Sequence, residues 1–205
     1  MASAGNKRED PMEIESVSHN VTGIPHHAQA EQSPARRKRD KAADIICRPA
    51  TPTDGRDMWT FVREAGVLEL NQSYAYILIC QHFGNTCLVA EKDGRMVGFV
   101  LAYVPPRQPD TVFVWQVGVA REVRGRGVGI KLLRQLLALD GCRNVTYLEA
   151  SITPSNKASQ SLFRAFARKN GVPCRKLPFF PADFFPEPHE PEDLYRVGPF
   201  EWPEA

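Results

Sequence analysis

The chain has 205 residues, of which 42% are hydrophobic, and its formal net charge is +2. That length is enough for one domain with a buried core and too short for two large domains. A net charge so close to zero gives no global field that would draw the protein to nucleic acid or to an anionic membrane, so neither partner is expected.

Residues 1–42 are predicted to form a disordered tail ahead of one folded domain over residues 43–200. The tail is polar, has few large apolar side chains and contains the basic run Arg36-Arg37-Lys38-Arg39, so it cannot bury a core of its own. Such a run usually forms a solvated surface. The alternative is a targeting or nucleic-acid-binding role.

The five cysteines are scattered, odd in number and never spaced as C-x-x-C. This pattern argues against a disulfide framework and against a zinc site, so we expect reduced thiols and no metal. No apolar run approaches the roughly 18 residues of a membrane span, and the N-terminus lacks the hydrophobic segment of a secretory signal. The sequence therefore predicts a cytoplasmic protein.

The first half of the domain alternates apolar and polar residues in short runs. In chain order, the predicted elements are a strand at 44–48, a helix after Pro52, a helix at 73–83, and strands at 86–91 and 96–104. Thr53 or Asp54 can cap the first helix. Asp93-Gly94 is typical of a two-residue hairpin turn between the last two strands.

The second half continues with strands and helices in turn. We predict a strand at 111–119, a helix from about Val128, a strand at 145–151 and, capped by Ser155, a helix that ends near Gly171. The helix from Val128 has apolar residues at helical spacing, namely Val128, Leu132, Leu133, Leu136 and Leu137. Strands interleaved with helices, after an early hairpin, predict an α/β fold whose mixed sheet is covered on both faces.

A glycine-rich turn, residues 124–129, joins the strand ending Val117-Gly118-Val119 to the next helix. Glycines at three alternate positions remove β-carbons that would keep a ligand from the main chain, so successive N–H groups can converge on one anion. The helix N-terminus adds unpaired amides, and Arg124 and Arg126 add positive charge. The turn is predicted to bind phosphate, and a tight connection without a ligand is the alternative.

The glycines run G-x-G-x-G and no Gly-Lys-Ser/Thr follows, so neither a Walker-type site nor a dinucleotide fold is indicated. The motif resembles the pyrophosphate loop of the GCN5-related N-acetyltransferases (GNAT). The resemblance implies the GNAT fold, a mixed and mostly antiparallel sheet splayed between two parallel strands, with acetyl-coenzyme A as cosubstrate. It implies cofactor contacts from Val117, Val119, Arg124, Gly125, Arg126, Gly127, Val128, Gly129, Asn156 and Ser159.

Residues 153–163 resemble the second signature of that family, an Asn after a strand followed by a helix with a small residue and an aromatic. Asn156 is the candidate for a pantetheine contact because its amide can both donate and accept. The alternative is an ordinary helix cap. Many relatives have a Tyr where this chain has Phe163, and that Tyr commonly protonates the departing thiolate. The general acid must then be another residue or a water, or is not needed.

Three further stretches, 66–76, 113–117 and 189–199, resemble the L-2,4-diaminobutyrate acetyltransferases of ectoine biosynthesis. The resemblance runs from about Ile45 to Pro199. It implies acetyl transfer to the side-chain amine of diaminobutyrate, and a homodimer by default. The acceptor pocket that it implies is lined by Glu69, Tyr74, Trp115, His189 and Glu192.

Diaminobutyrate has two ammonium groups and one carboxylate, so its pocket needs carboxylates such as Glu69 and Glu192. An alkyl ammonium with a pKa near 10 needs roughly 4 kcal/mol to lose its proton at pH 7. Glu192 is the preferred base and His189 the alternative, while Glu69 and Tyr74 orient the substrate. Each residue also has an alternative without a functional role: a surface position for the two glutamates, a core position for Trp115 and a solvated loop for His189.

The amine is expected to attack the thioester directly, with main-chain N–H groups near residues 117–119 stabilising the oxyanion. No cysteine has a convincing His partner in the sequence, which argues against an acyl-enzyme. Three other functions stay open. The first is an acetyltransferase of the same fold acting on a protein lysine, an N-terminus or a polyamine. The second is a protein that binds coenzyme A as a sensor and catalyses no reaction, and the third is a nucleic-acid binder that uses the basic tail.

Overall fold

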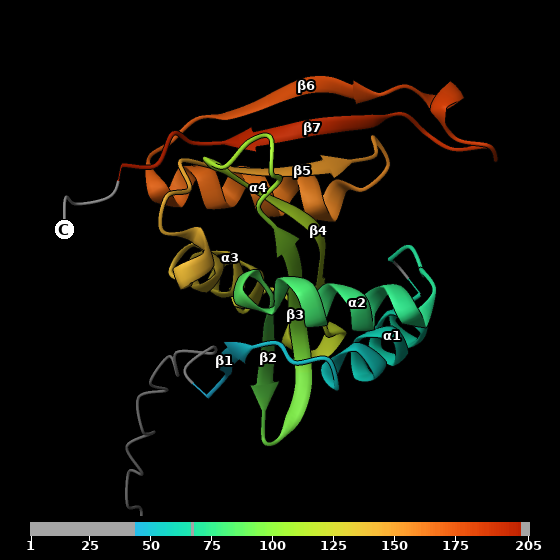
Figure 1. Cartoon of the computed structure of the whole chain (residues 1–205), viewed down its shortest axis with the longest axis vertical. Coiled ribbons are helices and arrows are strands. Elements are labelled where there is room, and N and C mark those ends of the chain that lie inside the picture. The colour runs from blue at the N-terminus through green and yellow to red at the C-terminus, as the bar shows by residue number, and fades with distance from the viewer. Residues whose placement is uncertain (1–43, 67, 202–205) are drawn as a thin grey trace, which may run out of the picture. The chain divides into compact units, whose positions relative to one another are not determined.

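The computed structural model describes residues 44–66 and 68–201, so the predicted tail over residues 1–42 lies outside the described residues. Figure 1 shows the arrangement of the helices and strands. In chain order they are β1 (Ile46–Pro49), α1 (Asp54–Ala65), α2 (Ser73–Phe83), β2 (Leu88–Lys92), β3 (Arg95–Tyr103), β4 (Thr111–Val119), α3 (Val128–Leu137), β5 (Tyr147–Ile152), α4 (Lys157–Asn170), β6 (Cys174–Phe180) and β7 (Glu192–Val197).

The seven strands form one sheet in the order β1-β2-β3-β4-β5-β7-β6. Every neighbouring pair is antiparallel except β4 and β5, which run parallel. A parallel neighbour requires a crossover, and α3 provides it between these two strands. The predicted α/β class, with a mixed and mostly antiparallel sheet, is confirmed.

Helices cover both faces of the sheet, as predicted. On one face α3 and α4 contribute Leu132, Leu136 and Phe166 to a buried core shared with β2 to β5 and β7. On the other face α1 and α2 contribute Met58 and Tyr76 to a second core over β2 and β3. In Figure 1 α2 crosses in front of β3 with α1 beside it. The sheet is therefore the middle layer of three.

Several predicted boundaries agree with the structure. The helix at 73–83 and the strand at 111–119 have the bounds of α2 and β4. The predicted hairpin forms between β2 and β3, where Asp93 (φ 51°) and Gly94 (φ 72°) both have positive φ. A two-residue type I′ turn requires this conformation at both positions, and Asp-Gly is one of the few pairs that tolerate it.

Two features differ from the sequence predictions. The N-cap of α4 is Asn156 and not Ser155, because the Asn156 side chain accepts the hydrogen bond from the helix. Strands β6 and β7 were not predicted. Every residue of β6 after Cys174 is exposed, so no alternation of buried and exposed residues marks this strand.

An ion-pair network ties β1 to α1 and β2. Arg48 donates to both carboxylate oxygens of Asp54 (2.8 and 2.7 Å) and to one oxygen of Glu91 (3.0 and 2.6 Å). Thr51 also donates to Asp54 from its main-chain N–H and its hydroxyl. Thr53 is the N-cap of α1, as one of the two predicted alternatives had it, but its side chain forms no cap hydrogen bond, and Asp54 binds Arg48 and Thr51 instead. The hydrogen bonds from Arg48 lower the pKa of Asp54 to about 2.

Arg48→Met is expected to lower the free energy of unfolding by about 2 kcal/mol at pH 7, because Asp54 then stays buried without its cation. A carboxyl whose pKa is lowered by folding stabilises the protein above about pH 4, and this contribution is lost as the pH falls through about 2. Urea unfolding should show the deficit of the variant shrinking by about half between pH 7 and pH 3.

Arg143→Met is the control, because it removes an exposed pair with Asp140 (2.8 Å) and should change the free energy of unfolding by no more than about 0.5 kcal/mol. An equal deficit for Arg48→Met at both pH values would contradict the role given to Asp54.

Candidate active site

β4 and β5 diverge after a short parallel contact. They pair only over residues 111–113 and 147–149, although both strands continue beyond those pairs. The divergence opens a cleft of about 1070 Å³. Its walls consist of Leu68, Glu69, Asn71, residues 114–117, residues 150–153, residues 155–159, Phe163, residues 188–190 and Glu192.

The main chain of β4 offers hydrogen-bonding groups to this cleft. The N–H of Ala120 donates to the carbonyl of Val97 on β3 (2.9 Å), and in an antiparallel pair every second residue bonds to the same neighbour. The main-chain groups of Val117 and Val119 therefore point away from β3, toward the side from which β5 has diverged. Both valines were predicted as cofactor contacts. Val117 lines the cleft, so a ligand there can reach its main chain, whereas Val119 is not among the cleft walls and its carbonyl accepts a hydrogen bond from Arg124.

The glycine-rich turn lies between β4 and α3. Gly125 (φ 71°) and Gly127 (φ 83°) have left-handed backbone conformations that favour glycine, and nothing among the described residues lies within 4 Å of where a Cβ would stand at either position. Gly127 is the N-cap of α3, so the first N–H groups of that helix have no partner within it. Arg126 is exposed beside them. The turn has the open, electropositive main chain that a phosphate site requires.

Other members of the turn have structural partners as well. A Cβ at Gly129 would lie 3.0 Å from Cδ1 of Leu162, so this glycine lets α3 pack closely on α4. This packing is a structural reason for the glycine, and the sequence interpretation, in which its missing Cβ admits a ligand, stays a prediction. Arg124 donates from Nε to the carbonyl of Val119 (3.0 Å), and the side chain of Val128 is buried in the core. Cofactor contacts from these residues stay predictions.

The N-terminus of α4 forms another part of the wall. Asn156 accepts a hydrogen bond at Oδ1 from the main-chain N–H of Ser159 (3.0 Å), so the helix-cap alternative is present. The amide nitrogen of Asn156 has no partner among the described residues and stays available to a ligand. Phe163 is buried and also lines the cleft, so the structure places no hydroxyl at the position where many relatives have Tyr.

A β-bulge in β4 directs two consecutive side chains to the same face of the sheet. Trp115 is the extra residue between the β3 pairings of Val114 and Gln116. Val114 packs in the core under α3 and α4, whereas Trp115 packs on Tyr76 of α2 (ring centroids 5.7 Å apart). Gln116 reaches the same side, where Nε2 donates to the carbonyl of Glu69 (2.8 Å). Regular alternation would have turned Gln116 toward α3 and α4.

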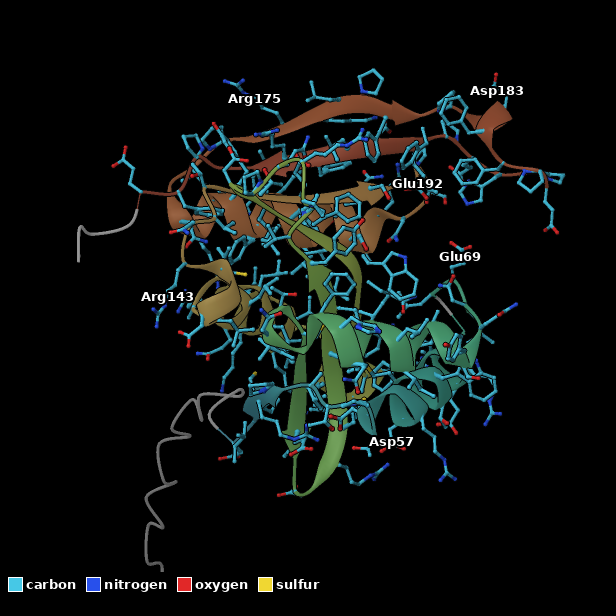
Figure 2. The ribbon with its side chains drawn as sticks, in the orientation of Figure 1. Asp57, Glu69, Arg143, Arg175, Asp183 and Glu192 are labelled. Carbon is cyan, nitrogen blue, oxygen red and sulfur yellow. The ribbon has the colours of Figure 1, made fainter. Side chains whose placement is uncertain are left out.

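Four of the five predicted acceptor residues line the cleft. Glu69 precedes α2, Trp115 is on β4, and His189 and Glu192 come from the chain around the start of β7. Figure 2 shows Glu69 and Glu192 facing each other from separate parts of the fold. Tyr74 does not join them. It is 64% exposed on α2 and is absent from the cleft walls, so its role stays a prediction that this geometry does not support.

Glu192 is the first residue of β7 and is partly buried in the cleft wall. Burial raises the pKa of its carboxyl group, and the charges of Glu69 and Asp193 raise it further. A hydrogen bond from Ser151 and the charge of His189 act in the opposite direction. Oε2 of Glu192 is buried and has no hydrogen-bond partner within the described structure. Such a carboxylate can accept a proton from an amine bound in the cleft.

His189 lies in the loop between β6 and β7. Its ring stacks on Phe185 with centroids 4.0 Å apart, and Nδ1 lies 2.5 Å from the carbonyl oxygen of Glu190. The carboxylate of Glu190 accepts a hydrogen bond from the main-chain N–H of Ser155 (3.0 Å). This contact fastens the loop to the turn before α4. His189 is therefore held at the cleft and does not lie in a freely solvated loop.

Sequence reasoning missed Gln116, Ser151 and Glu190. Gln116 stands beside Trp115 in a stretch that was singled out, but a regular strand would not place both side chains at the same cleft. Ser151 and Glu190 act through contacts with Glu192 and Ser155, which are distant in the sequence. No local pattern could have revealed those pairs.

None of the five cysteines lines the cleft. Burial raises the pKa of Cys80 and Cys142 to about 12 and that of Cys87 to about 11, so these thiols stay protonated at neutral pH. A thiol is a poor nucleophile compared with a thiolate. The arrangement therefore gives no support to a cysteine acyl-enzyme.

Residues 44–66 and 68–201 contain neither a metal-binding cluster nor a membrane-spanning helix. No group of three or more His, Cys, Asp or Glu side chains is placed to hold a metal ion. None of the helices in that part of the chain combines the length and the apolar composition needed to span a bilayer.

Residues 56–167 match the profile of the acetyltransferase (GNAT) family. The chain is 48% identical over 157 residues to an L-2,4-diaminobutyric acid acetyltransferase of Marinococcus halophilus, which covers 76% of this chain and 91% of that protein. It is 46% identical over 160 residues to one of Nocardia farcinica, covering 78% of this chain and 83% of that protein.

This chain is also similar to proteins of known structure. The diaminobutyrate acetyltransferase EctA from Paenibacillus lautus, in complex with its substrate L-2,4-diaminobutyric acid and coenzyme A, is similar with a TM-score of 0.73 and 36% identity, over 78% of this chain and 98% of that chain. The protein yncA from Salmonella typhimurium, solved with acetyl-CoA, has a TM-score of 0.57 at 18% identity, over 78% and 97% of the two chains. At that identity the likeness concerns the fold alone.

Gly125→Ala is expected to raise the Kd for coenzyme A about tenfold or more, because a side chain at φ 71° strains the turn and a methyl group enters the space above its N–H groups. Isothermal titration calorimetry measures this. Gly171→Ala is the matched control, since that glycine has φ 68° and open surroundings but follows the C-terminus of α4 and is not part of the turn at residues 124–129. Equal losses of affinity in the two variants would count against a phosphate site at the turn.

Proposed function

Because this chain belongs to the acetyltransferase (GNAT) family, and within it to the L-2,4-diaminobutyric acid acetyltransferases, we propose that it transfers the acetyl group of acetyl-coenzyme A to the 4-amino group of L-2,4-diaminobutyrate. The product, N4-acetyl-L-2,4-diaminobutyrate, is the precursor that is later cyclised to ectoine. Acetyl-coenzyme A supplies an activated thioester to this reaction. The protein binds, orients and deprotonates the amine.

The observation that carries this proposal is the pair of carboxylates at one cleft. Glu69 and Glu192 come from segments far apart in the sequence and both line the same space. Two carboxylates in one partly desolvated site repel each other, and this repulsion contributes to the raised pKa of Glu192. A ligand with two ammonium groups relieves the repulsion. Diaminobutyrate has two such ammonium groups. Its single carboxylate then binds a partner other than these two glutamates.

The turn at residues 124–129 is not among the cleft walls, but it follows directly from β4 and suits the phosphate ester. The open turn at Gly125 and Gly127 and the first turn of α3 fit a pyrophosphate, and the main chain at Val117 and Val119 fits an amide-bearing arm lying along β4. Asn156 adds a donor at the start of α4. In this arrangement the thioester would lie between β4 and β5, next to the carboxylates.

Glu192 is the residue that we assign as general base. Its raised pKa brings the carboxylate closer to the pKa of an ammonium, and its buried Oε2 lacks a partner in the described structure. The neighbouring charge of Glu69 makes proton uptake by Glu192 more favourable. The free amine then forms a bond to the thioester carbon, and main-chain N–H groups of β4 that face the opening can stabilise the negative charge on the carbonyl oxygen. Collapse of this intermediate breaks the C–S bond and releases coenzyme A as its thiolate, and the proton that the nitrogen loses balances the charge of that thiolate.

A cytoplasmic homodimer is part of the same proposal. Free cysteines suit a reducing compartment. Large apolar side chains are exposed on β6 and just after it, namely Leu177, Phe179, Phe180 and Phe184. Figure 2 shows Arg175 and Asp183 at opposite ends of this region, so two copies related by a two-fold axis would pair opposite charges. Sedimentation velocity that finds only monomers at micromolar concentration would contradict this part. We infer no nucleic-acid or membrane partner.

The proposed reaction is tested by incubating the purified protein with acetyl-coenzyme A and L-2,4-diaminobutyrate and identifying the acetylated nitrogen by NMR. We expect acetylation at N4, and a kcat/KM at least tenfold higher than for lysine or ornithine, because a longer chain displaces one ammonium from its carboxylate. Faster turnover of a peptide lysine would favour a protein acetyltransferase. Tight binding of coenzyme A without turnover of any amine would favour a sensor.

Glu192→Gln is expected to lower kcat by about a hundredfold or more, because an amide cannot accept the proton of the ammonium. In the wild type, kcat should fall as the pH drops through the raised pKa of Glu192, since only the ionised carboxylate is a base. That acidic limb should be absent from the pH profile of the variant. Glu187→Gln, on the same loop, exposed and away from the cleft walls, is the control and should keep wild-type kcat. A wild-type pH profile retained in Glu192→Gln would assign the base elsewhere.

A further inference from the structure

Buried polar atoms without partners are concentrated at one place in this fold. Across the described residues, three buried side-chain oxygens have no hydrogen-bond partner: Oη of Tyr76, Oε1 of Gln116 and Oε2 of Glu192. Gln116 and Glu192 line the cleft, and Tyr76 packs on Trp115, which also lines it. Folded proteins pair nearly all such groups, so a cluster of unpaired oxygens at a cleft points to hydrogen-bond partners that arrive with a ligand.

Gln116 is the member of this cluster that lines the cleft and has no role in the function proposed above. It is only 9% exposed, and the bulge at Trp115 is what turns it toward the cleft and away from α3 and α4. Its Nε2 donates to the carbonyl of Glu69 (2.8 Å). That bond fixes the orientation of the amide, because a flipped side chain would set oxygen against oxygen. Oε1 is therefore an acceptor held in place, on the Glu69 side of the cleft.

We propose that Gln116 is a specificity-determining residue for the acceptor, and that its Oε1 accepts a hydrogen bond from the 2-ammonium group of diaminobutyrate. This inference rests on the proposed function. Glu192 receives the reacting 4-amino group, which leaves the 2-ammonium for the opposite wall. There the carboxylate of Glu69 and Oε1 of Gln116 can share its three N–H donors.

The same side chain also holds the Glu69 segment. One end of the Gln116 amide binds the main chain at Glu69, while the other end binds the substrate. The site therefore favours substrates that have an amine at C2. A substrate that lacks this amine leaves the buried Oε1 of Gln116 without a hydrogen-bond partner. Sites built in this way reject analogues that lack the matching donor much more strongly than apolar pockets do.

The test compares L-2,4-diaminobutyrate with 4-aminobutyrate, which lacks the 2-amino group, in the wild type, Gln116→Leu and Gln116→Glu. Gln116→Leu should lower the ratio of the two kcat/KM values at least tenfold and leave KM for acetyl-coenzyme A within twofold. Gln116→Glu keeps an acceptor oxygen but not the donor to Glu69, so it should keep most of the discrimination. Gln135→Leu, an exposed glutamine on α3, is the control and should match the wild type.

Three outcomes would overturn the inference. Discrimination retained in Gln116→Leu would show that Oε1 does not bind the 2-ammonium. Equal loss in Gln116→Leu and Gln116→Glu would reduce Gln116 to a support for the Glu69 segment. A wild type that acetylates neither compound would remove the proposed function and this inference together, whereas the first two outcomes leave the proposed function intact. Calorimetric binding of coenzyme A to each variant confirms that it is folded.

Discussion

The early separation of β4 from β5 is the constraint on which the rest of the site depends. Two parallel strands that stay paired leave no space between them and satisfy each other's main chain. Here the pairing stops after residues 111–113 and 147–149, and the remainder of β4 keeps its bonds to β3 on one side only. Unpaired main-chain groups inside a protein need partners. The unpaired main-chain groups of β4 that face the cleft can therefore bind an extended ligand that has its own hydrogen-bond donors and acceptors.

The two parts of the proposed site depend on different parts of the fold. The glycine-rich turn and α3 follow directly from the end of β4, so the proposed phosphate part is fixed by local chain geometry. The acceptor end combines the segment before α2, the bulge in β4 and the start of β7. Its carboxylates meet only because the sheet brings β7 next to β5. The glycine-rich turn can therefore occur in proteins with different acetyl acceptors, whereas the segments that are distant in the sequence determine which acceptor binds.

The features that could be predicted from the sequence are those that neighbouring residues determine. The glycine turn, the Asp93-Gly94 hairpin and the bounds of α2 and β4 each depend on residues within a few positions of one another. The family resemblance added Glu69 and Glu192, which the fold brings to one cleft. Strands β6 and β7 and the bulge at Trp115 escaped prediction because pairing across the sheet creates them.

The hydrogen bond between Ser155 and Glu190 joins the two ends of the cleft mechanically. The backbone that leads into α4, where Asn156 would meet the pantetheine arm, is held by the same carboxylate that anchors the loop of His189. The segments that would meet the cofactor and the amine are thus linked by one hydrogen bond. A donor bound at Asn156 would through this link also restrain the far wall before the amine arrives, which would favour an ordered sequence of substrate entry over a random one.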